Sequence, residues 1–83
     1  MKIVTKNIIL SENTVIASDG FFGFIIQNLS ESLVTVNNSI VLRQYERYDN
    51  YQLPVESQYL NDITINSDTQ SNTKVAVILY YKK

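Results

Sequence analysis

The fold is decided by residues 13–28, which read NTVIASDGFFGFIIQN. β-branched and aromatic residues dominate both sides of Asp19-Gly20, a dipeptide that tolerates the positive φ angles of a two-residue type I′ turn. We therefore expect a β-hairpin here, with Val15 facing Phe24 across the two strands. The residues predicted to share the buried face of this hairpin are Val15, Ala17, Phe22, Phe24 and Ile26.

The opposite face of the same hairpin is not cleanly polar. It would carry Ile16, Phe21 and Ile25 around Gly23. An apolar outer face on a sheet is commonly covered by another chain, so this face is a candidate for contact with a partner. Gly23 opposite Ile16 could mark a β-bulge or a close approach of two backbones.

A second hairpin is predicted over residues 33–43. Two apolar runs, 33–36 and 40–43, flank Asn37-Asn38-Ser39, and asparagine tolerates the left-handed backbone conformation better than any residue except glycine. Two registers are open, one placing Val34 against Val41 and the other Val36 against Val41. A slip of one residue exchanges the buried and exposed sets, and the pattern does not decide between them.

The rest of the chain continues the β pattern. A short alternating strand is expected at 63–66, after a turn at 54–57 and before a polar loop at 67–73. The last strand, 74–82, is apolar on both faces, so it is either central in a sandwich or pressed against a second subunit. One face of it carries Val75, Val77, Leu79 and Tyr81, and the other carries Ala76, Ile78 and Tyr80.

These signals together predict an all-β protein. Ile, Val and Thr supply 24 of the 83 residues against two Ala, an excess that favours strands because β-branched side chains suit a pleated surface. About eight short strands in a chain of this length indicate one compact antiparallel β-sandwich or jelly roll, and residues 1–83 form a single domain.

The composition excludes most site chemistry. The chain has no Cys and no His, which removes thiol nucleophiles, thiolate zinc sites and the usual general base of hydrolases. Seven basic and eight acidic residues give a net charge of −1, which provides no basic patch for nucleic acid or an anionic membrane. We expect no catalytic residue, no cofactor and no metal. Calcium at Asp62 and Asp68 is disfavoured because no ligand-loop motif is present.

The best binding-site candidate is the Tyr-rich segment 44–52. Tyr45, Tyr48 and Tyr51 recur every three residues, and arginines precede and interrupt them. Tyr offers a flat face to a sugar or a peptide, and Tyr and Arg are enriched at binding hot spots, although ordinary packing is the competing interpretation. The residues expected to mediate interactions are Arg43, just before this segment, and Tyr45, Arg47, Tyr48 and Tyr51 within it. Phe21, Ile25 and Tyr80 are expected to do so on the strand faces.

The order of the elements also carries a family resemblance. Residues 20–42, reading GFFGFIIQNLSESLVTVNNSIVL, resemble a run in short β-sandwich proteins of tailed bacteriophages, where an aromatic-x-Ile-x-Asn-Leu strand leads through a polar turn to Val-Thr-Val-Asn. The runs 53–57, 63–65 and 75–83 are similar in order and spacing. The chain departs from the family in having Asn38 where Asn-Gly is frequent, and in its Tyr-rich segment where a short Pro-Gly turn is common.

The resemblance implies a virion component, an auxiliary or decoration capsid protein most like those of crAss-like phages. Such a protein would be made in the host cytoplasm and would bind the major capsid protein, or other virion proteins, on the capsid exterior. Homo-oligomer formation is a further expectation, and no binding residue transfers one by one. Two alternatives stay open: a small carbohydrate-binding module that uses Tyr45, Tyr48 and Tyr51 as a platform, and an assembly subunit encoded by the host.

Overall fold

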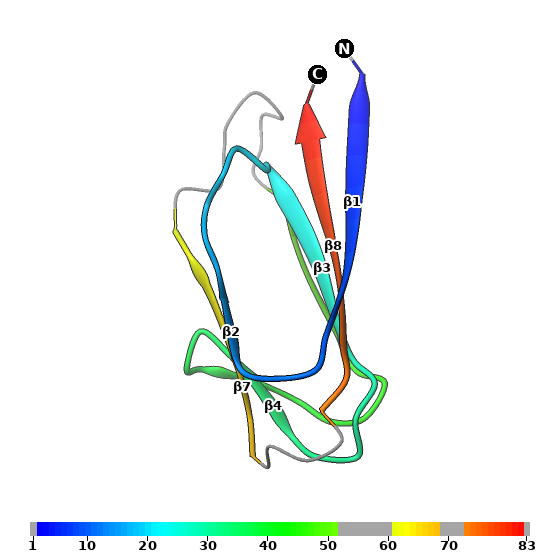
Figure 1. Ribbon diagram of the computed structural model, residues 1–83, viewed down its shortest axis with the longest axis vertical. Helices are drawn as coiled ribbons and strands as arrows, with labels where there is room; N and C mark the ends of the chain where they lie inside the picture. The colour runs from blue at the N-terminus through cyan, green and yellow to red at the C-terminus, as the bar shows by residue number, and fades with distance from the viewer. Residues whose placement is uncertain (1, 52–60, 69–72, 83) are drawn as a thin grey trace.

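A computed structural model describes residues 2–51, 61–68 and 73–82. The chain is all-β, with eight strands and no helix within these ranges (Figure 1). The strands are β1 (Ile3–Leu10), β2 (Thr14–Ile16), β3 (Gly23–Asn28), β4 (Val34–Val36), β5 (Ile40–Leu42), β6 (Arg47–Tyr51), β7 (Ile63–Ser67) and β8 (Val75–Lys82). The turn expected at 54–57 lies outside the described residues, as does the middle of the polar loop at 67–73.

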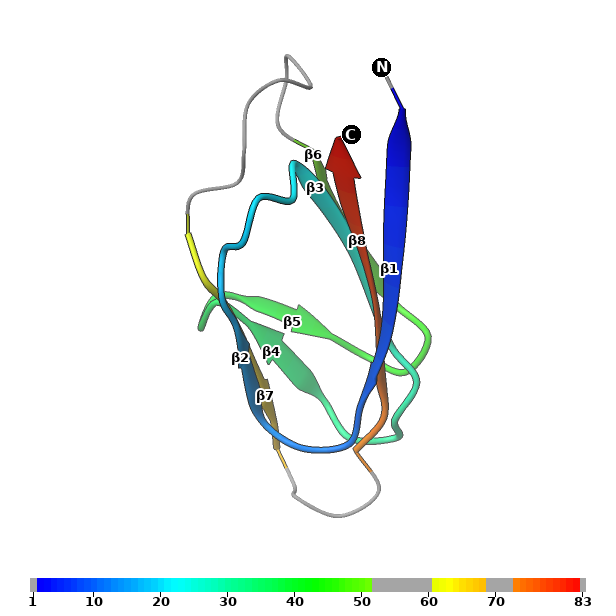
Figure 2. The same cartoon turned by 45° about the horizontal axis from the view of Figure 1, so that its top comes forward.

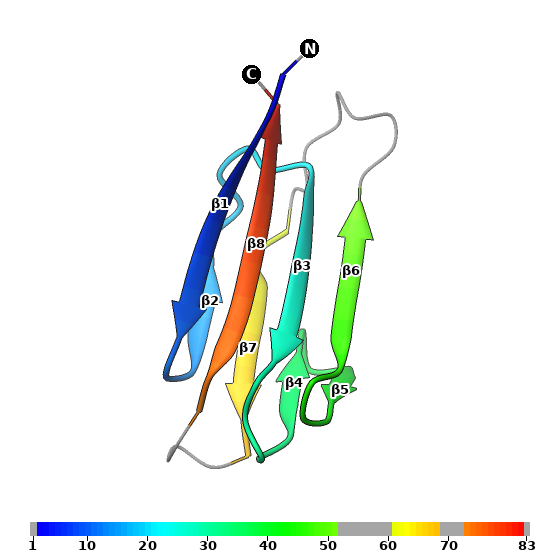
Figure 3. The same cartoon turned by 90° about the vertical axis from the view of Figure 1, so that its right-hand side faces the viewer.

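The strands form two four-stranded antiparallel sheets that face each other (Figures 2 and 3). The strand order is β1-β8-β3-β6 in one sheet and β2-β7-β4-β5 in the other. β1 thus pairs with β8, β2 with β7, β3 with β6 and β4 with β5, and two further pairings, β3 with β8 and β4 with β7, complete the sheets. The predicted all-β sandwich of eight short strands is confirmed.

The core lies between the sheets, because alternate residues of each strand point inward. On β8, Val75, Val77 and Leu79 are at most 2% exposed, whereas the residues between them are half-buried. The inward-facing residues that form the core are Ile16, Phe21, Phe24, Ile26, Val34, Val36, Leu42, Ile63, Ile65, Val75, Val77 and Leu79. Of the two alternatives for the last strand, the structure shows the central position, since β8 lies between β1 and β3.

The predicted first hairpin is wrong. β2 and β3 lie in different sheets, and Val15 pairs with Thr64 of β7, while Phe24 pairs with Leu79 of β8. Gly20 has a φ of 106°, but Asp19 is not among the residues with positive φ, so the two-residue type I′ turn is absent. β3 is hydrogen-bonded on both sides, by β6 and by β8, and so has no free edge to offer β2.

The residues predicted to be buried and exposed on these strands therefore also differ from those observed. Val15 is 61% exposed rather than buried, and Phe21, expected on an outer face, is fully buried between the sheets. Its ring meets those of Phe24 and Tyr81 edge-on, each at a centroid distance of 6.3 Å. Phe21 therefore serves the core and offers no contact to a partner.

A β-bulge separates Phe21 from the regular part of β3. Gly23 pairs with Tyr80, and the Phe22 N–H donates to the same Tyr80 carbonyl at 2.8 Å, so two residues oppose one. The extra residue reverses the alternation, so Phe21 and Phe24 both point inward while Phe22 packs against the outward Tyr80 ring at 6.3 Å. Gly23 thus marks a bulge, as considered from the sequence, but opposite Tyr80 and not Ile16.

The second hairpin is confirmed, with a register that neither alternative anticipated. β4 and β5 pair with Thr35 opposite Val41, so both of those side chains point outward. The tight turn predicted at Asn37-Asn38 is present, because these residues have φ angles of 54° and 59° and the Ser39 N–H donates to the Val36 carbonyl. Two consecutive positive φ angles are the signature of a type I′ turn.

Candidate interaction surface

The outer face of the β1-β8-β3-β6 sheet is built from rows of residues that lie opposite one another. In an antiparallel sheet, directly opposed residues project to the same face. Because Ile78 pairs with Asn7 on one side and Ile25 on the other, and Ile25 pairs with Asp49, these four residues form one row across all four strands. The row has two isoleucines in its centre and a polar residue at each edge.

The two neighbouring rows are less regular than the central one. One contains Ala76 and Gln27 in the centre, with Ile9 and Arg47 at the edges. The other contains Tyr80 in the centre, packed against Phe22. Ile25, Ala76, Ile78 and Tyr80 are half-buried within the chain itself, and Phe22 is 4% exposed.

The central row of this outer face has the composition of a protein interface, because its two apolar residues are bordered by Asn7 and Asp49. The opposite outer face, on the β2-β7-β4-β5 sheet, differs. Its outward residues are the β-branched Val15, Thr35, Val41 and Thr64, together with Asn66. The larger apolar and aromatic side chains are therefore collected on one side of the molecule.

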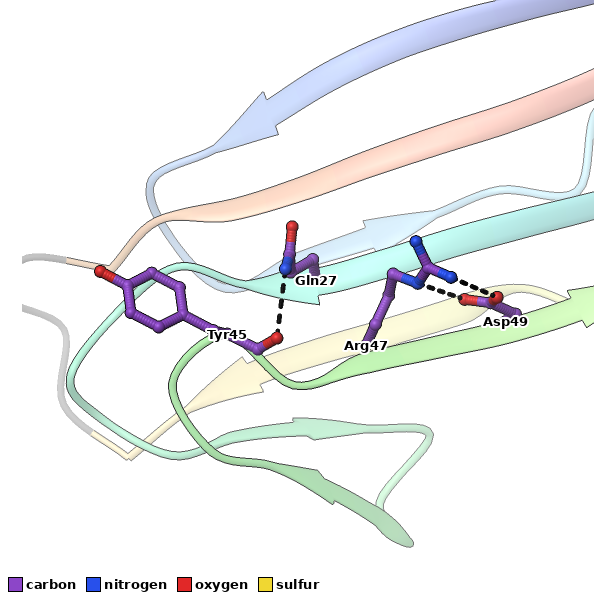
Figure 4. A network of polar contacts seen from close by, with 4 residues as sticks. All are labelled: Gln27, Tyr45, Arg47 and Asp49. Carbon is purple, nitrogen blue, oxygen red and sulfur yellow. Dashed lines mark hydrogen bonds and ion pairs between the residues drawn. The ribbon is translucent and has the colours of Figure 1, made fainter.

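An ion pair lies on the β6 border of the apolar face (Figure 4). Arg47 Nε lies 3.2 Å from Asp49 Oδ1, and Arg47 Nη2 donates to Asp49 Oδ2 at 3.3 Å. The two residues are two positions apart on one strand and so project to the same face. Their side chains are 58% and 35% exposed, so the pair contributes little to stability, but it holds the guanidinium at the rim of the sheet.

The turn between β5 and β6 adjoins one corner of this face. The Glu46 N–H donates to the Arg43 carbonyl at 3.1 Å, and the Glu46 carboxylate accepts the Arg43 N–H at 2.7 Å. Within the turn, Tyr45 has a φ of 68° and is 66% exposed. The Gln27 side-chain amide, on the outer face, donates to the Tyr45 carbonyl at 3.1 Å, which fastens the turn to the sheet (Figure 4).

A buried asparagine holds the same turn from inside. Asn28 is fully buried at the end of β3, and its backbone N–H donates to the Glu46 carbonyl at 3.1 Å. Its side-chain Nδ2 donates to the Ser32 carbonyl at 2.8 Å and to the Leu42 carbonyl at 3.0 Å, while Oδ1 accepts the Ser30 N–H at 2.8 Å. One side chain thus joins the end of β3, the loop after it and the end of β5.

Tyr45 and Tyr48 of the Tyr-rich segment do not form one platform. Tyr48 points inward, half-buried, with its ring 5.8 Å from that of Phe24 in an edge-on arrangement. Tyr45 projects from the turn before β6, and the side chain of Tyr51 lies outside the described residues. Tyr45 lies in a turn and Tyr48 on the strand that follows, so their rings do not share a face.

The predicted interaction residues therefore separate into three groups. Ile25, Tyr80 and Arg47 share the outer face, Arg43 and Tyr45 lie in the adjoining turn, and Phe21 and Tyr48 belong to the interior. The sequence-based selection missed Ile78 and Asp49, which complete the central row. The alternation of the last strand and the Arg-x-Asp spacing are the signals that point to them.

A separate polar contact closes the other end of the sandwich. The Tyr81 hydroxyl donates to Asp19 Oδ1 at 2.9 Å, which fastens the β2–β3 connection to β8. Burial, with the hydrogen bond to Asp19 and the charge of that carboxylate, raises the pKa of Tyr81 to about 12. The group is therefore a neutral donor across the physiological pH range, and its role is structural.

The described residues contain no group of three or more His, Cys, Asp or Glu side chains that could hold a metal ion. In the same ranges, no helix is long and apolar enough to cross a membrane. Comparison of the chain with models of protein families, with curated proteins and with solved structures finds no significant match. The function is therefore inferred from the geometry of the described residues alone.

Proposed function

We propose that the protein is a non-enzymatic structural protein of a phage virion. In this role it is an auxiliary, or decoration, capsid protein that binds the major-capsid lattice or another virion protein and stabilises it or supports head fibres. It is made in the host cytoplasm and resides on the capsid exterior. The observation that carries the proposal is the outer face of the β1-β8-β3-β6 sheet, apolar in its centre and polar at its border.

The strand order supports interpreting the sandwich as a jelly roll. Each strand of the first half pairs with its counterpart from the second half, as in a long hairpin wrapped into two sheets. Jelly rolls occur in viral capsid proteins and in lectins. The fold is therefore compatible with the virion proposal and with its carbohydrate-binding rival, and the choice between them depends on the surface.

The surface favours contact with a protein. Ile25 and Ile78 lie side by side in the middle of the sheet, where an apolar partner surface would remove them from water, and the Arg47–Asp49 pair borders them. With strands about 4.8 Å apart and rows about 7 Å apart, the three rows cover on the order of 300–400 Å². The apolar residues occupy the middle of this area, and the polar residues of the rows surround most of it.

Binding to purified heads of the phage that encodes the chain tests the proposal. Wild-type protein should co-sediment with heads, and Ile78→Lys should abolish co-sedimentation because the charge falls in the centre of the apolar face. Val41→Lys is the matched control, since Val41 is a β-branched strand residue, 55% exposed, on the outer face of the other sheet. Circular dichroism and thermal unfolding verify that both variants fold.

Three outcomes count against the proposal. The first is absence of the protein from purified virions, measured by mass spectrometry. The second is equal binding of heads by the two lysine variants, which would detach binding from the outer face. The third is self-association of the wild type, in analytical ultracentrifugation, that Ile78→Lys abolishes while heads are not bound, which would make the face a contact between copies.

A carbohydrate-binding module is the second candidate, and the exposure of the Tyr45 ring favours it. The platform expected from three tyrosines is reduced, because Tyr48 packs against Phe24. This candidate predicts that soluble polysaccharide quenches tyrosine fluorescence and that Tyr45→Ala removes the quenching. Tyr48→Phe, which keeps the core ring, is the control and should leave quenching by polysaccharide in place.

A further inference from the structure

Tyr45 occupies a backbone conformation that the rest of the described chain gives to asparagine and glycine. Four described residues have positive φ: Gly20 at 106°, Asn37 at 54°, Asn38 at 59° and Tyr45 at 68°. A Cβ atom in this conformation crowds the following carbonyl oxygen, which Asn tolerates and a bulky residue does not. The third position of the turn 43–46 therefore favours Gly or Asn, yet the chain has Tyr there.

Packing does not compensate for this strain. At 66%, Tyr45 is the most exposed of the large hydrophobic residues of the described chain, and its ring points away from the sheet (Figure 4). Its backbone, however, is held on both sides, because its N–H donates to the Asn28 carbonyl and its carbonyl accepts from the Gln27 amide. Strained residues that the surroundings fix in place are concentrated at functional sites.

We infer that Tyr45 is the anchor through which this corner of the molecule engages a protein partner, an inference that rests on the function proposed above. Gln27 belongs to the outer face and its amide fastens the Tyr45 carbonyl, so the turn that carries the ring adjoins that face. The face alone covers less than the roughly 800 Å² per partner of a standard interface, so a stable complex needs contacts beyond it.

The neighbours of Tyr45 define the chemistry of the partner. Arg43 is exposed and its guanidinium forms no ion pair within the described residues, and Tyr beside Arg is the composition of a binding hot spot. The partner surface should therefore offer an apolar pocket for the ring with a carboxylate beside it for Arg43. A sugar is the less favoured ligand, because Tyr48 is packed inward and leaves Tyr45 as the one exposed ring among the described side chains of this segment.

Three variants separate recognition from folding. Tyr45→Asn releases the strain, so we expect its Tm to rise by at least about 4 °C. The same variant should bind purified heads at least about 30-fold more weakly, the loss typical of a hot-spot residue. Tyr45→Phe keeps both the ring and the strain, so its Tm should stay at the wild-type value and most of the binding should remain.

Asn38→Tyr is the matched control, because it places the same side chain in the same backbone conformation on a turn away from the proposed surface. It should lower the Tm by a similar amount, roughly 4 °C or more, and leave head binding unchanged. A binding loss in Tyr45→Asn together with normal binding by Asn38→Tyr then cannot come from a change in stability.

The inference is overturned if Tyr45→Asn has the same Tm as the wild type or a lower one, since Tyr45 would then serve folding. It is also overturned if Tyr45→Asn binds heads as tightly as the wild type, or if it loses polysaccharide binding alone. Failure of the wild type itself to bind heads would overturn the proposed function and the anchor with it. That outcome can be distinguished from failure of the anchor alone, because the wild type and every variant would then all fail to bind heads.

Discussion

Changing Asn28 to Asp tests the buried hydrogen-bond network with almost no change in side-chain shape. Asn28 is fully buried, and its amide donates to the carbonyls of Ser32 and Leu42 at 2.8 and 3.0 Å. A carboxylate has no N–H group, so in the variant an oxygen would face both carbonyl oxygens. The third bond, accepted from the Ser30 N–H, would be kept.

The expected loss follows from the contacts. The two donated hydrogen bonds contribute about 1 kcal/mol each to the free energy of unfolding. Because the variant also buries a charge that faces two unpaired acceptors, its total loss of unfolding free energy should be about 3–5 kcal/mol. A domain of this length unfolds with roughly 4–12 kcal/mol, so the substitution removes a large share of the total free energy of unfolding. The Tm should fall by at least about 12 °C at neutral pH.

The loss should depend on pH in a defined direction. A protonated acid can donate its O–H to one of the two carbonyls, so the folded state of Asn28→Asp raises the pKa of the introduced carboxyl group above the usual value of about 3.9. The folded variant then holds its proton to a higher pH than the unfolded chain does. Its free energy of unfolding is greatest below about pH 3.9 and declines as the pH rises toward the folded-state pKa.

Urea unfolding of wild type and variant, monitored by circular dichroism near pH 3 and near pH 7, measures both effects. Asn38→Asp is the control for charge alone, because Asn38 is exposed and Asp also tolerates its backbone conformation. This control variant should change the free energy of unfolding by no more than about 0.5 kcal/mol. Equal stability of Asn28→Asp and wild type at neutral pH would refute the assigned hydrogen bonds.

Three further predictions concern single contacts. Because the pKa of Tyr81 is raised to about 12 from its usual 10.0, its contribution to stability should be complete below pH 10 and lost as the pH rises toward 12. Ultraviolet difference titration should show a late tyrosine ionisation that Tyr81→Phe removes. Ser67→Ala should leave the protein as stable as the wild type or stabilise it by about 1 kcal/mol in urea unfolding, because the buried Ser67 Oγ has no hydrogen-bond partner among the described residues; a clear loss would show a missed partner. A double-mutant cycle of Arg47→Ala and Asp49→Ala should give a coupling below about 1 kcal/mol that falls with added salt, and a larger, salt-independent value would contradict the exposure of the pair.

The parts of the fold that the sequence predicts are those with local causes. The alternation from Val75 to Leu79 identifies a central strand, and Asn37-Asn38 identifies a tight turn, because each depends only on neighbouring residues. The strands that pair with β2 and with β3 could not be predicted in the same way. The pairing depends on which strands occupy the two sides of β3, and both partners, β6 and β8, come from later in the chain.

In the candidate surface too, features with local causes could be predicted and features set by distant contacts could not. Ile25 and Tyr80 follow from strand alternation, whereas the interior position of Phe21 depends on a one-residue bulge opposite Tyr80 that reverses the alternation. The carbohydrate-binding alternative required Tyr45 and Tyr48 to belong to one platform. A turn ends between them, and the strand that follows directs Tyr48 toward Phe24.

The pairing of β1 with β8 determines how the molecule carries mechanical load. The two strands lie side by side along their whole length, with Ile3 opposite Lys82 and Leu10 opposite Val75 (Figure 1). Tension applied between the outer ends of these strands would open them like a zipper, breaking one pair of backbone hydrogen bonds at a time. The sandwich is therefore weak when pulled by these ends, whereas pressure on the broad sheet face is shared by four strands at once.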